Sequence, residues 1–149
     1  MTKDVLITIS GLQLMIGEES SPIEVITTGE YYLKNGKHYI LYEEVMEDFD
    51  GITKNRIKIG DGRMDIFKNG VSRVHMVFEK NKKNLTSYQT PYGNLMLGIE
   101  ASRLHIEQEE NNIDIKVKYD LDVNYEHLAE CTLAMNIKPR DTKDFLLNS

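Results

Sequence analysis

The side chains that most often do chemistry are scattered in this chain of 149 residues. No two of its four histidines are spaced two or four residues apart, so no local metal-binding pair exists. The four are His38, His75, His105 and His127. Isolated histidines on strands are more often surface residues than ligands, so we predict no metal site and no cofactor. The glycine-rich and nucleophile motifs of common enzymes are also absent.

Cys131 is the only cysteine, which excludes an intrachain disulfide. It alternates in phase with Leu133 and Met135, and a cysteine in such apolar company is normally inert packing rather than a nucleophile. We therefore predict that Cys131 belongs to the core.

Alternation of apolar and polar residues dominates the chain and predicts the elements that must position any site. The clearest example is 113–123, where Tyr119 falls on the apolar phase. About ten strand candidates follow one another through short turns, with no persuasive amphipathic helix. A β-sandwich also fits, but hairpin-length links favour a closed antiparallel up-and-down β-barrel of about 8–10 strands. We predict a single domain over 1–149, with an ordered core at about 4–138 and a C-terminal tail at 139–149.

The turn at Asn35-Gly36 predicts one hairpin in detail, because a two-residue Asn-Gly loop favours a type I′ turn. In that register Leu33 faces His38 and Tyr31 faces Ile40. Tyr31, Leu33, Ile40 and Tyr42 then point into the barrel.

Glu44 shares this inward face, beside Tyr42. A buried carboxylate must be paired or protonated, and we consider Arg56 or Arg73 as its partner. The alternative is that Glu44 lies at a wet rim. An eight-stranded barrel either fills its interior or leaves room for one small ligand. The candidate interior binding residues are Tyr31, Tyr42, Glu44, Arg56, Arg73 and Tyr119.

The opposite face of the same hairpin brings Tyr32 opposite Tyr39 on the outside. Together with Leu41 they form a candidate interaction surface for a protein partner or a second copy. A loop or the tail at 141–149 could instead cover them.

Two turn regions leave the register open. A two-residue loop at Asn69-Gly70 would place Met64 opposite His75 and mix polar with apolar partners, so a longer loop or a bulge is expected. After Gly11 the apolar phase shifts to Leu12, Leu14 and Ile16, which predicts a bend.

The net charge of −6 argues against nucleic acid as a partner, because phosphate binding needs a basic patch. The cluster Lys80, Lys82 and Lys83 is typical of a solvated loop. No segment has the length of a membrane-spanning helix or the character of a signal peptide, so we expect a cytoplasmic protein with no membrane partner.

Four segments resemble the bacterial YwiB-like family: Thr28–Tyr32, His38–Glu44, Tyr88–Leu95 and Ile113–Val123. Their order and spacing span almost the whole chain. The resemblance implies a calycin-like, lipocalin-shaped barrel in a cytoplasmic protein of Gram-positive bacteria. It supplies no catalytic residues, because the family has no known function.

Three functions compete on this evidence. The first is a non-enzymatic barrel that holds a small amphipathic molecule in its interior. The second is an interaction module that uses the Tyr32–Tyr39 face. An enzyme is the third, because no acid, base or nucleophile constellation is recognisable.

Overall fold

The computed structural model describes residues 1–11, 24–45 and 51–140, and these form ten β-strands. The strands are β1 (Asp4–Ser10), β2 (Glu24–Lys34), β3 (Lys37–Val45), β4 (Ile52–Gly60), β5 (Arg63–Asn69), β6 (Arg73–Glu79), β7 (Lys83–Thr90), β8 (Gly93–Glu109), β9 (Asn112–Val123) and β10 (Glu126–Pro139). The described ranges contain no helix long and apolar enough to cross a membrane.

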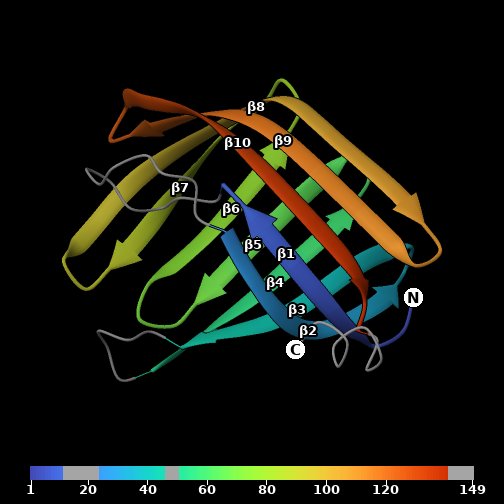
Figure 1. Ribbon diagram of the computed structural model, residues 1–149. Helices are drawn as coiled ribbons and strands as arrows, with labels where there is room; N and C mark the ends of the chain where they lie inside the picture. The colour runs from blue at the N-terminus through green and yellow to red at the C-terminus, as the bar shows by residue number, and fades with distance from the viewer. Residues whose placement is uncertain (12–23, 46–50, 141–149) are drawn as a thin grey trace.

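Each strand pairs antiparallel with the next, and β1 also pairs with β10, which closes the sheet into a barrel (Figure 1). The predicted closed up-and-down barrel is therefore confirmed. Closure gives every strand two neighbours and removes the exposed edges of an open sheet.

The β2–β3 hairpin has the predicted register, with Tyr31 opposite Ile40 and Leu33 opposite His38. Asn35 and Gly36 have φ angles of 54° and 75°, the positive values that a type I′ turn requires. Leu33 is a correction to the predicted inward set. It lies at the end of its strand and is 63% exposed, because the strand has already passed the rim.

The β5–β6 connection is longer than two residues, as expected. Asn69 pairs with Arg73, so three residues form the loop, and Met64 faces Phe78. The register thereby places apolar residues opposite one another on the inner face. In β8 the apolar phase shifts where Ser102 bulges out of the ladder. The predicted bend at 12–16 lies outside the described residues, although Gly11 before it has φ 89°.

The interior is filled by buried apolar side chains from every strand but β7, whose partly buried Tyr88 packs against them. The largest fully buried ones include Phe78, Ile57 and Ile115. Phe78 packs edge-on against Tyr119, with 5.1 Å between ring centroids. This packing leaves the polar side chains at the two ends of the barrel and on its outer surface.

Two junctions in the wall have short ladders. The described pairs of β2 with β3 run only from Glu30 to Lys34, and β6 pairs with β7 only through Arg73 and Gln89. The backbone groups beside these junctions lack the cross-strand bonds found elsewhere in the barrel, so both are natural places for a groove.

Candidate functional site

Glu44 points into the barrel near one end, as the hairpin register predicts. Its Oε1 accepts hydrogen bonds from Lys68 Nζ at 2.9 Å and from Asn55 Nδ2 at 2.8 Å. Lys68 Nζ also donates to Asn55 Oδ1 at 2.8 Å. The Lys68 side chain is 16% exposed and that of Glu44 32%, so this triad is half-buried at the rim. It satisfies the carboxylate without an outside ligand.

Arg56 and Arg73 are corrections to the predicted partners of Glu44. Both are exposed and lie on the outer face. Each is next to an inward residue, Ile57 and Val74, and successive side chains of a strand point to opposite faces. Lys68 takes their predicted place.

The three predicted interior tyrosines belong to the packed core. Tyr31, Tyr42 and Tyr119 are 8%, 5% and 3% exposed. Burial raises the pKa of all three hydroxyls above the usual value, and the nearby charge of Glu44 raises the pKa of Tyr42 further. Each tyrosine therefore stays neutral at physiological pH and contributes mainly by packing.

Cys131 packs against this core on the apolar phase, as predicted. It is half-buried and stands opposite Tyr119 in the β9–β10 ladder. Burial raises the pKa of its thiol, which keeps it protonated and weakly reactive.

His38 corrects the expectation that the histidines lie on the surface. It is 8% exposed at the opposite end of the barrel from Glu44. Gln108 Nε2 lies 2.5 Å from His38 Nε2, and Tyr31 Oη lies 2.5 Å from His38 Nδ1. Both polar atoms of the ring are satisfied within the chain.

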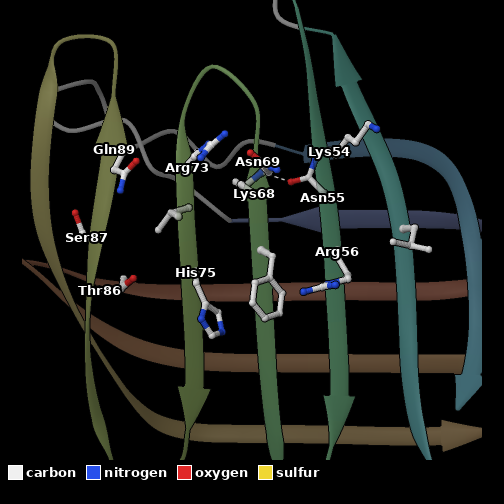
Figure 2. A pocket seen from close by; sticks show the side chains of 13 residues that line it. Lys54, Asn55, Arg56, Lys68, Asn69, Arg73, His75, Thr86, Ser87 and Gln89 are labelled. Carbon is white, nitrogen blue, oxygen red and sulfur yellow. Dashed lines mark hydrogen bonds between the residues drawn. The ribbon is translucent and has the colours of Figure 1, made fainter.

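A group of polar side chains lies on the outer wall, across β3 to β7. A groove of about 600 Å³ opens there beside the β6–β7 junction (Figure 2). Its described lining residues are Leu41, Lys54, Asn55, Arg56, Phe67, Lys68, Asn69, Arg73, Val74, His75, Thr86, Ser87 and Gln89. None of them is acidic, although the whole chain carries a net charge of −6.

Strand register builds this groove from two outward rows. One row places Lys54 opposite Asn69, and Asn69 opposite Arg73. The other row places Arg56 opposite Phe67, and Phe67 opposite His75. Between the rows, the inward-facing residues Asn55 and Lys68 contribute to the floor.

Arg56, Phe67 and His75 form a ladder of planar groups across β4, β5 and β6. The Arg56 guanidinium carbon lies 4.4 Å from the Phe67 ring centroid. The Phe67 and His75 rings stack at 4.0 Å between centroids with 16° between planes. Cation–π and ring stacking both stabilise such a ladder, so its members are held upright from the wall.

Asp65 fixes one end of this ladder. Its carboxylate accepts hydrogen bonds from Arg63 Nε at 2.7 Å and from His75 Nε2 at 2.9 Å. Burial alone would raise the pKa of Asp65, but the bonds from Arg63 and His75 outweigh it and lower the pKa below its usual value. The carboxylate is ionised at neutral pH and orients the imidazole ring.

The predicted interaction surface does lie on the outside, but its rings already have contacts. Tyr32 is 38% exposed, and its hydroxyl donates to Glu30 Oε2 at 2.6 Å. Lys3 Nζ lies 5.8 Å from the Tyr32 ring centroid. Lys58 Nζ lies 6.0 Å from the Tyr39 ring centroid. Tyr39 and Leu41 are both half-buried. Leu41 also lines the groove.

Sequence reasoning missed Phe67 and His75 as site residues and Lys68 as the partner of Glu44. Alternation within each strand could have placed Arg56 and Arg73 outside, since Ile57 and Val74 adjoin them. The rows themselves could not be found that way, because they depend on the register between strands.

The described residues define a closed antiparallel β-barrel of ten strands, with apolar side chains filling its interior and a cation-lined groove on its outer wall. The chain belongs to the family described as Domain of unknown function (DUF1934), whose model matches residues 7–135. The resemblance seen in the sequence is thereby confirmed.

Two comparisons place it further. The chain is 28% identical over 113 residues to the protein called Uncharacterized beta-barrel protein YwiB from Bacillus subtilis (strain 168), covering 74% of this chain and 78% of that protein. The crystal structure of the ywiB protein from Bacillus subtilis matches with a TM-score of 0.77 at 18% identity, covering 93% of both chains. The second likeness shows the fold alone.

Proposed function

We propose that this chain is a non-enzymatic binding protein whose small ligand carries negative charge and occupies the groove on the outer wall. The observation that carries this proposal is the lining of the groove. It gathers Lys54, Arg56 and Arg73 in a chain of net charge −6, with no carboxylate among the described lining residues. Glu43 stands opposite Lys54 in the β3–β4 ladder, but the ion pairs of the described residues involve none of these three cations. Cations so placed attract an anion and add directed hydrogen bonds.

The size and composition of the groove support the same reading. A volume of about 600 Å³ falls within the usual range for small-molecule sites. Phe67 and Leu41 supply apolar surface, and Asn69, Ser87 and Gln89 supply hydrogen-bonding groups. A ligand with one anionic and one apolar part, which is an amphipathic molecule, matches both.

The interior site expected from the sequence has weaker support. Tyr31, Tyr42 and Tyr119 are packed in the core, and Glu44 already has Lys68 as its partner. A ligand in the interior would have to displace well-packed side chains, at a cost of several kcal/mol. The proposal therefore keeps the binding function and moves its site to the outer wall.

Native mass spectrometry of gently purified protein tests the proposal. We expect an added mass of small-molecule size that disappears on denaturation. It should be lost in the Arg56→Gln/Arg73→Gln double variant and kept in Arg103→Gln, which removes a guanidinium from the exposed surface of β8.

Each other outcome argues against the groove. An added mass that survives in the double variant places the ligand elsewhere. A dimer without added mass would favour the second candidate function, an interaction module that uses Tyr32, Tyr39 and Leu41. A bare monomer would count against any tightly held ligand.

A further inference from the structure

We propose that the ligand of the outer groove is a nucleotide, with its base stacked on His75 at the β6–β7 junction and its phosphate held by Arg73. This inference rests on the proposed function and names the ligand class for the same groove. Three features carry it: an unfinished ladder of planar groups, an interruption in the wall beside it, and a cation one row away.

The ladder of planar groups ends at His75. Phe67 has both faces occupied, one by Arg56 at 4.4 Å and the other by His75 at 4.0 Å. Because Phe67 covers His75 from the β5 side, the remaining face of the imidazole is turned toward β7. A further flat ring would continue the stack there at the same spacing. Nucleobases are well suited to this position, since every base has a π-face.

The wall is interrupted where that ring would lie. The described pairing of β6 with β7 consists of Arg73 and Gln89 alone. Beside His75, the strand β7 contributes Thr86 and Ser87 to the groove. The Ser87 hydroxyl and the Gln89 amide, which share the outward phase of β7, both donate and accept hydrogen bonds. This is the chemistry that the edge of a base requires, as distinct from a purely apolar ring.

Arg73, which would hold the phosphate, lies at a suitable distance from His75, on which the base would stack. Arg73 and His75 are two residues apart on β6, so they share the outer face and lie about 7 Å apart along the strand. A sugar fills such a gap between base and phosphate in a nucleotide. Asn69 lies opposite Arg73, and Lys54 lies opposite Asn69. Arg73 offers a planar fork of donors that matches two phosphate oxygens.

The lysine and the arginines of the groove's two outward rows form no ion pair with an acidic side chain of the described ranges. The ion pairs found there involve Arg63, Lys68 and other cations, but not Lys54, Arg56 or Arg73. His75 differs, because Asp65 bonds its Nε2 and fixes its ring plane. The site thus separates a charge-binding row from an oriented stacking surface.

The net charge of −6, averaged over the whole chain, predicts no nucleic-acid partner. The groove gathers Lys54, Arg56, Lys68 and Arg73 with no acidic residue among its described lining, so the average does not describe the local field. The same nucleotide chemistry could be supplied by a free mononucleotide or by a short single strand. The volume of about 600 Å³ accommodates the first without extension along the wall.

Isothermal titration calorimetry with a matched series tests the inference. The probes are adenosine monophosphate, ribose 5-phosphate, adenosine and a single-stranded oligothymidylate, each titrated at the same two salt concentrations. We expect adenosine monophosphate to bind at least about fivefold more tightly than ribose 5-phosphate, which is the smaller end of the range for stacking one base.

Variants then separate the two positions. His75→Ala should remove the advantage of adenosine monophosphate and leave ribose 5-phosphate unchanged, whereas His75→Phe, which retains a ring, should restore it. Arg73→Gln should weaken both phosphates by about tenfold. Arg103→Gln should change neither. Circular dichroism and melting curves of each variant exclude a folding defect.

The outcomes distinguish the inference from the function on which it rests. Equal affinity for adenosine monophosphate and ribose 5-phosphate, lost in Arg73→Gln, would overturn the nucleotide and leave an anion-binding groove. No binding of either phosphate would overturn both. Tighter binding of the oligothymidylate, with affinity falling steeply in salt, would confirm nucleotide chemistry and assign its source to a single strand.

Discussion

The two sides of the barrel differ in how continuously their strands are paired. On one side, the long-strand wall, β8 and β9 pair from Leu97 to Glu109, and β10 continues the ladder on β9. On the other side, the groove wall of β3 to β7, the ladder narrows to one pair between β6 and β7. Continuous pairing contributes stability, while the interruption exposes side chains and backbone that a ligand can contact. Binding regions are commonly drawn from the less stable part of a fold.

The largest expected effect concerns the core beneath the long-strand wall. Ile115→Ala removes a side chain that is 1% exposed, and we expect it to lower the free energy of unfolding by about 3 kcal/mol. Thr86→Ala, beside the β6–β7 junction, should cost less than about 0.5 kcal/mol. Urea denaturation measures both. Equal losses of unfolding free energy in the two variants would contradict the proposed difference in stability between the two walls.

The next effect concerns the charged triad at the rim. Lys68→Met removes the partner of Glu44 and a hydrogen bond to Asn55, so we expect a loss of about 2 kcal/mol. Arg73→Gln removes an exposed outward cation and should change stability by less than about 0.5 kcal/mol. The reverse order in thermal denaturation would reinstate Arg73 as the partner of Glu44.

Asp65 gives the groove wall a pH dependence. Its pKa is lower in the folded protein than in the unfolded chain, so the unfolded state binds more protons at acidic pH. Its contribution is complete above the unfolded value of about 4 and is lost as the pH falls through the lower folded value. Asp65→Asn should cost about 1 to 2 kcal/mol at neutral pH and flatten the stability curve below about pH 4.

Asp114 is the matched control for that prediction. Its pKa is also lowered, by hydrogen bonds from Asn136 and Asn112 on the surface of the long-strand wall. Because it faces solvent, Asp114→Asn should alter the acid limb of the curve less than Asp65→Asn does. Denaturation series between pH 2 and pH 7 compare the two variants. This range extends about 2 pH units below the pKa of an unperturbed aspartate, where the difference is expected. A larger change for Asp114 would show that Asp65 is not the dominant titrating group.

The smallest effect is dynamic. Amides of β7 that face β6 lack ladder partners beyond the Arg73–Gln89 pair, so they should exchange with deuterium faster than the amides of β9. Hydrogen exchange followed by NMR resolves the two sets. Saturation of the groove with a bound ligand should slow exchange in β7 and leave β9 unchanged. Uniform protection in both strands would contradict the interruption in the wall.

The parts of the fold that depend on local chemistry were predictable from the sequence. The Asn35-Gly36 turn determines its own register, and this placed Tyr31, Tyr42 and Glu44 correctly on the inner face. Strand alternation likewise predicted the buried phase that contains Tyr119.

The candidate site was not predictable in the same way. Its groove depends on the three-residue loop between Asn69 and Arg73, whose length fixes which residues of β5 and β6 stand side by side. A shift of one residue would separate Phe67 from His75. Lys68 was missed for the same reason, since its contact with Glu44 spans β3, β4 and β5.

The closure of β1 onto β10 separates the order of synthesis from the order of assembly. The Arg140 nitrogen donates to the carbonyl oxygen of Asp4 at 2.9 Å, so the two ends of the described barrel meet. A ring of antiparallel neighbours joined in this way has no obligatory first strand. The polypeptide could begin at another hairpin and still enclose the same core.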